Sequence, residues 1–201
     1  MIFSGIKETL TNPISRTYTI AAGIIFGSFV GYLSSSQQIL QIQYKLGDSF
    51  SLYFGGLALV IGLSSFANSQ LLVKFSMETL CLASLSVLSI TSGLFFFYSQ
   101  SSSGQPNLIF FMSYLAITFF CFGILFGNFN TLALQPLGHI AGVANSMISS
   151  VQTLISVGIG GTIGQYYDGT IIPLVFGFFI CATIAFAILS LHIKSTPKIS
   201  K

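Results

Sequence analysis

The sequence contains very little charge. Only seven basic and four acidic residues occur among its 201 residues, whereas 53% of the residues are hydrophobic. Soluble domains carry roughly 25% charged residues, so these few side chains cannot cover a water-facing surface. A surface that faces hydrocarbon needs no charge, and the composition therefore excludes a soluble globular domain. The basic residues also form no stripe, which argues against a nucleic-acid partner.

Groups that carry catalysis or bind metals are equally scarce. His139 and His192 are the only histidines and are placed in loops or at helix ends. Cys81, Cys121 and Cys181 have spacings that match no metal motif, and each lies in an apolar run where a thiol is ordinarily buried and inert. No acidic residue is placed at mid-membrane depth, so the chain shows no proton-coupling site of its own. We expect a protein that is not an enzyme and has no catalytic residue, metal or cofactor.

Six long apolar stretches are each close to the roughly 20 residues that a helix needs to cross a bilayer. A backbone in lipid must satisfy its own hydrogen bonds, which favours helix, and a membrane barrel would show alternating segments of about ten residues instead. We therefore expect an all-α membrane protein with a six-helix bundle over residues 17–193, a cytoplasmic lead-in at 1–16 and a cytoplasmic tail at 194–201. The predicted helices cover residues 17–34, 49–68, 80–98, 108–127, 141–166 and 171–193.

The distribution of lysine and arginine predicts the orientation of these helices. An even number of spans places both termini on one side of the bilayer, and basic residues concentrate on the cytoplasmic side. One side holds only Lys45. The other side holds six basic residues, which predicts cytoplasmic termini: Lys7, Arg16, Lys74, Lys194, Lys198 and Lys201.

Glycines four residues apart mark three of the predicted helices. Such spacing gives a flat face on which another helix can pack closely. Two of the pairs lie 96 residues apart, about half the chain, and each belongs to the first helix of a three-helix set. Two sets of three spans have opposite orientations in the membrane, which predicts a 3+3 inverted repeat. The helix-packing glycines are Gly23, Gly27, Gly31, Gly123, Gly127, Gly160 and Gly164.

A few polar residues fall within the predicted helices. Tyr114 lies near the middle of the fourth, where its hydroxyl either bonds to a neighbouring helix or lines a cavity that binds substrate. Asn145 and Gln152 are seven residues apart and share one face of the fifth helix. They either form hydrogen bonds between helices or line a polar pathway. We take Tyr32, Tyr114, Asn128, Asn145 and Gln152 as candidate substrate-binding residues.

Three segments resemble the Bcr/CflA-like multidrug efflux branch of the major facilitator superfamily. The run from Leu134 to Leu174 contains P-x-G-x-x-A-G-x-A-x-S, a pattern similar to the eleventh-helix region of that family. GYLSSSQQILQIQY (Gly31–Tyr44) resembles the end of its seventh helix, and NSQLLVKFSM (Asn68–Met77) the link between its eighth and ninth helices. The resemblance extends from about Pro13 to Pro197 and covers only the C-terminal six of the family's twelve helices.

This resemblance implies proton-coupled efflux of small amphipathic drugs by alternating access, in a bacterial inner membrane. It implies that the first and fourth helices line the central cavity, that the second and fifth pack against an N-terminal six-helix half, and that the third and sixth face lipid. That half is either part of the same polypeptide or a separate chain. Two other hypotheses stay open: a membrane scaffold or assembly subunit, and a half-transporter that works as a homodimer.

Overall fold

The computed structural model describes residues 2–195, which form helices and connecting turns without a strand. The expected all-helical, membrane-type architecture is confirmed in these coarse terms, because the long helices are apolar enough to cross a bilayer. The predicted tail at 194–201 lies outside the described residues beyond Ser195. The α-helices are α1 (Ile2–Thr11), α2 (Pro13–Gln37), α3 (Phe50–Leu71), α4 (Met77–Ser101), α5 (Leu108–Leu134), α6 (Ala141–Gln165) and α7 (Ile172–Ser195).

Short polar side chains define where three of these helices begin. The Asn12 carboxamide oxygen accepts hydrogen bonds from the backbone N–H groups of Ile14 and Ser15, at 3.1 and 3.0 Å, and proline occupies the first position of α2. Ser76 caps α4 and Asn107 caps α5 in the same way. These caps satisfy N–H groups that have no partner within the helix. Several helices are longer than the apolar stretches that predicted them, because polar residues at their ends remain helical.

The lead-in expected at 1–16 contains a helix of its own. α1 packs against the beginning of α6, and Gly5 and Thr9 are buried. The carboxylate of Glu8 lies 3.0 Å from the imidazole of His139, in the 3₁₀ turn η3 (Gln135–Ile140) that joins α5 to α6. Both side chains are exposed, so this contact contributes little to stability. Hydropathy alone does not reveal α1, since its apolar residues occupy one face only.

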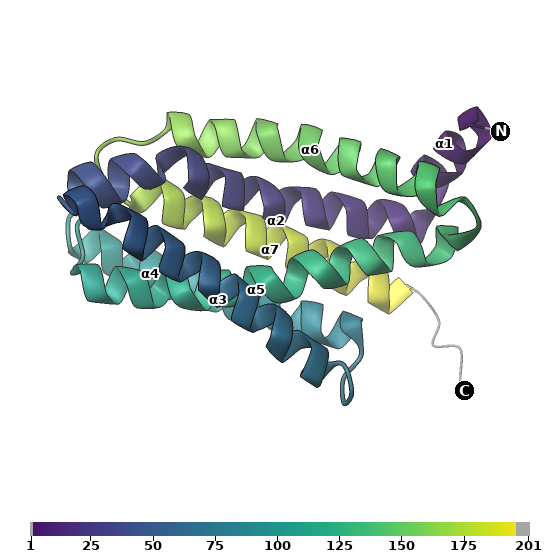
Figure 1. Cartoon of the computed structure of the whole chain (residues 1–201), viewed down its shortest axis with the longest axis horizontal. Coiled ribbons are helices and arrows are strands. Elements are labelled where there is room, and N and C mark those ends of the chain that lie inside the picture. The colour runs from purple at the N-terminus through teal and green to yellow at the C-terminus, as the bar shows by residue number, and fades with distance from the viewer. Residues whose placement is uncertain (1, 196–201) are drawn as a thin grey trace.

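α2 and α5 form the centre of the bundle. α2 packs against α5, α6 and α7, and α5 packs against α2, α3 and α4. In the most apolar stretch of α2, 67% of the residues are buried, compared with 11% in α3. Figure 1 shows α6 lying along α2 on the upper side of the bundle, with α3 on the lower side. α3 and α6 are therefore the two helices that this chain leaves most open.

The end of α2 is joined firmly to the turns on its side of the bundle. The helix continues as a π-helix, η1 (Gln38–Gln43), before a 3₁₀ turn, η2 (Gly47–Ser49). The Tyr44 hydroxyl donates to the Pro106 carbonyl at 2.8 Å, and the Tyr167 hydroxyl donates to the Gln38 carbonyl at 3.2 Å. Burial raises the pKa of both phenols, and Asp168 adds to this for Tyr167, so both stay protonated as donors.

Candidate functional site

The five candidate substrate-binding residues separate into two groups. Tyr32, Tyr114 and Asn128 are buried between helices of this chain, whereas Asn145 is exposed and Gln152 is partly exposed on α6. The structure therefore does not bring the five together in one wall. At lipid depth, polar side chains are more stable when they form hydrogen bonds within the bundle than when they contact hydrocarbon. This explains why Tyr32, Tyr114 and Asn128 are buried.

Tyr114 joins α5 to α4. Its hydroxyl lies 2.9 Å from the Ser92 hydroxyl, and its ring stacks on Phe95 with centroids 4.3 Å apart. The two roles considered for Tyr114 were a hydrogen bond to a neighbouring helix and a place in a substrate cavity. The observed contact is the hydrogen bond to α4. One edge of the ring also borders a shallow hollow between α4 and α5. Ser92 was not singled out in the sequence, because α4 contains many serines and none differs from the rest in spacing.

Asn128 forms a reciprocal pair with Asn68 of α3. Each carboxamide donates to the oxygen of the other, at 3.0 and 2.9 Å. The buried Asn128 amide and the partly exposed Asn68 amide thus satisfy each other at the contact between α3 and α5. The sequence placed Asn68 only at the end of a predicted helix, and no spacing pattern identified it as the partner of Asn128.

Tyr32 lies in the aromatic core. Its ring contacts Phe119 in an edge-to-face arrangement, with centroids 4.9 Å apart, and stacks on Phe54 at 6.1 Å. Its hydroxyl is buried and has no hydrogen-bond partner within the part of the chain that is described. A buried hydroxyl without a partner loses hydration energy.

A polar face is formed by α5 and α6 and consists of Asn130, Asn145, Ser149 and Gln152. On α6 the last three residues recur at helical spacing, and all four are at least partly exposed. The Gln152 amide donates to the Asn130 carboxamide oxygen at 3.0 Å. Gln152 lies eleven residues into α6, which is roughly 16 Å from its start. The spacing of Asn145 and Gln152 predicts that they share one face of α6. It does not predict that Asn130 of α5 is the hydrogen-bond partner of Gln152.

The predicted packing glycines lie mainly at two helix crossings. Gly23, Gly27 and Gly31 of α2 face Ile155, Ile159 and Ile163 of α6, and a methyl group at Gly27 would come within 2.8 Å of the Ile159 Cβ atom. Gly160 and Gly164 of α6 face Val30 and Ser34. Gly123 of α5 faces Ser64 and the Ile61 carbonyl of α3. Gly127 is the exception, because open space lies beside it next to the polar face.

The charged side chains lie towards the ends of the helices. The Glu78 carboxylate, at the start of α4, accepts a hydrogen bond from the Tyr18 hydroxyl at 3.2 Å, and the Tyr18 ring contacts the His192 ring edge-to-face at 5.8 Å. The three cysteines are buried and unpaired. The Thr17 hydroxyl, near the start of α2, lies 3.4 Å from His192 Nδ1.

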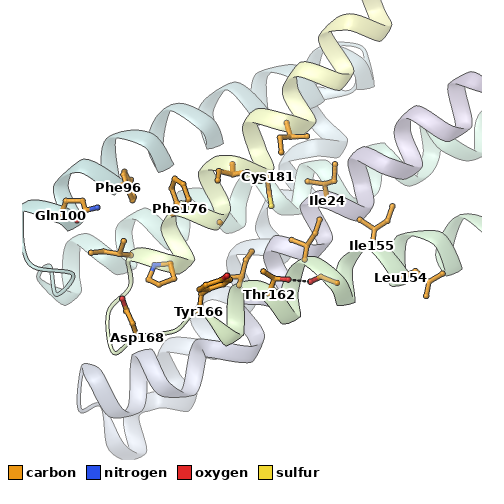
Figure 2. Close-up of a pocket in the computed structure, with 18 residues that line it drawn as sticks. Ile24, Phe96, Gln100, Leu154, Ile155, Thr162, Tyr166, Asp168, Phe176 and Cys181 are labelled. Carbon is orange, nitrogen blue, oxygen red and sulfur yellow. Dashed lines mark hydrogen bonds between the residues drawn. The ribbon is translucent and has the colours of Figure 1, made fainter.

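A large apolar groove runs between α6 and α7. It has a volume of about 960 Å³, and α2 and α4 contribute to its lining. Figure 2 shows aliphatic and aromatic side chains along its length, with Asp168 in the loop that joins α6 to α7. Gln100 of α4 and Tyr166, which directly follows α6, also lie at this end (Figure 2). No motif in the sequence predicts this groove, because its lining residues come from four helices and a loop.

Comparisons of the chain with models of known families, with curated proteins and with solved structures found no match.

Proposed function

We propose that this chain is the C-terminal six-helix half of a major facilitator transporter of the Bcr/CflA-like type. It would export small amphipathic compounds in exchange for protons, by alternating access about a site between two halves. The N-terminal half belongs either to the same polypeptide or to a separate chain. Two features support this proposal: a symmetric pattern of helix contacts and a polar face that needs a covered or aqueous environment.

The helix contacts are consistent with an inverted repeat in which α2, α3 and α4 correspond to α5, α6 and α7. Exchanging the two sets converts the α2–α6 contact into the α5–α3 contact, and the α2–α7 contact into the α5–α4 contact. All four contacts are present, and the remaining major contacts, α2–α5 and α4–α7, convert into themselves. Such pairing is expected for two three-helix units related by a two-fold axis in the membrane plane.

The closest crossings of the two sets occur at equivalent positions, and this observation carries the proposal. A Cβ atom at Gly160 would come within 3.0 Å of the Gly27 carbonyl, and one at Gly123 would contact Ser64. Gly27 and Gly123 are 96 residues apart, and so are Ser64 and Gly160. One offset therefore relates both partners of both crossings, as an internal repeat predicts.

The polar face supports a covered or aqueous environment on one side of α5 and α6. Uncovered amide and hydroxyl groups in hydrocarbon are unfavourable, and Asn145, Ser149 and Gln152 are open in this chain. A water-filled cavity between two halves would provide the environment that these groups require. The same face carries Asn130, and Phe26 of α2 is exposed as well. Together they would offer amide and aromatic contacts to an amphipathic substrate.

The open glycines of α3 and α6 favour a second six-helix half as the partner. Gly55, Gly56 and Gly62 of α3 and Gly142 of α6 have free space beside them. Glycine in a membrane helix commonly permits close approach of another helix, and no described helix approaches these positions. This observation also fits a homodimeric half-transporter or a scaffold, so the experiment must separate the three.

The test is transport by purified protein in proteoliposomes. The chain, alone or with the six-helix protein that co-purifies with it, is reconstituted, and ethidium movement driven by a pH gradient is measured. We expect flux only with the partner, and a several-fold reduction in Gln152→Ala. The control Thr183→Ala alters an exposed hydroxyl of α7 away from the polar face. Flux by the chain alone would favour the homodimer, and a stable complex without flux would favour the scaffold.

A further inference from the structure

The groove between α6 and α7 has the length of one membrane leaflet. Its lining extends from Leu154 of α6 to Tyr166, the residue that follows this helix, and on α7 from Ile172 to Ile184. Each range spans twelve residue steps, or roughly 18 Å along a helix. Half of a hydrocarbon core is about 15 Å thick. The groove therefore accommodates a chain that lies parallel to the helices within a single leaflet.

The walls of the groove are suited to hydrocarbon. Ile155, Ile159 and Ile163 line it from α6, and Phe176 and Ile180 line it from α7. α6 and α7 make few contacts with each other along this length, so the space between them is not closed by their own side chains. An open apolar groove at lipid depth excludes water, and an acyl chain fills it without loss of a hydrogen bond.

The end of the groove next to the α6–α7 connection is polar. Asp168 Oδ1 accepts hydrogen bonds from the Thr170 N–H and hydroxyl groups, at 3.0 and 2.7 Å, so the turn holds the carboxylate in place. No hydrogen bond to Asp168 Oδ2, the Gln100 amide or the Tyr166 hydroxyl occurs within residues 2–195. Among the described residues that line the groove, Asp168 alone is charged.

We propose that this groove binds a phospholipid whose headgroup carries a primary ammonium, such as phosphatidylethanolamine. An acyl chain lies along α6 and α7, and the ammonium group donates to the free oxygen of Asp168. Gln100 and Tyr166 provide donors for the phosphate. A choline headgroup has no N–H to donate, and an anionic headgroup is repelled by the carboxylate. The lipid belongs to the leaflet that contains the α6–α7 connection. This inference does not depend on transport.

The test measures retained lipid by native mass spectrometry of the purified chain in detergent. The protein is incubated with equal amounts of phosphatidylethanolamine, phosphatidylcholine and phosphatidylglycerol. Gly158→Leu places a side chain in the groove, where a Cβ atom meets nothing within 4 Å. Gly161→Leu is the matched control, because Gly161 also has free space but does not line the groove. Ile180→Trp obstructs the groove from α7.

We expect the wild type and Gly161→Leu to retain phosphatidylethanolamine preferentially, and the two obstructing variants to retain it about tenfold less. Asp168→Asn keeps the oxygen that caps the turn, and it should lose about threefold of the headgroup preference while still binding acyl chains. Equal retention of all three lipids by the wild type would overturn the proposal. Unchanged retention in both obstructing variants would also overturn the proposal. The lipid would then bind elsewhere on the protein, or another protein surface would cover the groove.

Discussion

The two equivalent helix crossings close by different chemistry. At the α2–α6 crossing, three glycines of α2 accept isoleucine side chains of α6, and the Ser34 hydroxyl donates to the Gly160 carbonyl at 3.5 Å. At the α3–α5 crossing, Gly123 lies against Ser64, and one helical turn further Asn68 and Asn128 form their reciprocal amide pair. Close approach of the helices therefore requires a small residue at both crossing points, whereas the side chains that flank it can differ.

The largest effect is expected when a methyl group is added at either crossing glycine. Gly27→Ala would bring a Cβ atom within 3.2 Å of the Ser156 Cα atom, and Gly123→Ala within 2.9 Å of the Ile61 carbonyl. Because backbone cannot move aside as a side chain can, each should destabilise the fold by about 2–3 kcal/mol. Unfolding in increasing denaturing detergent measures this loss.

Gly127→Ala is the control for both variants. Its Cβ atom would enter free space, so stability should stay the same or rise by up to about 1 kcal/mol from improved helix propensity. If only one crossing variant is destabilising, the two crossings are not equivalent, and the argument for an inverted repeat loses its main support.

A smaller effect is expected at the amide pair, which only one crossing has. Asn128→Leu leaves the Asn68 amide without a partner and should cost about 1–2 kcal/mol. The double variant Asn68→Leu/Asn128→Leu removes both polar groups and should recover most of that loss. A double-mutant cycle on the unfolding free energy gives the coupling. Strictly additive losses would show that the pair does not act as a unit.

Tyr114→Phe should have a weaker effect still. The substitution keeps the stacking on Phe95 and removes only the hydrogen bond with Ser92, worth about 0.6 kcal/mol between membrane helices. Ser92→Ala should give a similar value, and combining the two should add nothing further. Reduced ethidium flux in Tyr114→Phe at unchanged stability would instead assign its hydroxyl to substrate binding.

The smallest change in stability is expected on the polar face. Gln152→Ala breaks a partly exposed hydrogen bond with Asn130 and should cost less than about 0.5 kcal/mol. Its effect on transport should nevertheless exceed that of Tyr114→Phe, because Gln152 is accessible and Tyr114 is buried. Measuring both variants by unfolding and by flux separates residues that hold the bundle together from residues that face the transport path.

The sequence by itself determined the membrane class, the long helices and much of their ends. Scarce charge and long apolar runs restrict the chain to a bilayer, and capping residues such as Asn12 and Asn107 act through the backbone of their own helix. Glycine spacing indicated the faces that pack closely. Each of these signals is local, because it depends only on residues that are close together in the sequence.

Only the tertiary structure decided which polar groups meet. Asn68 with Asn128, Ser92 with Tyr114, and Asn130 with Gln152 come from helices whose separation and rotation no local pattern specifies. The same is true of the groove, which exists because α6 and α7 both pack on α2 but hardly on each other. The hydrogen-bond partner of a side chain depends on the positions of two segments at once, and the packing of the whole bundle sets those positions. A membrane-spanning helix depends on one segment only.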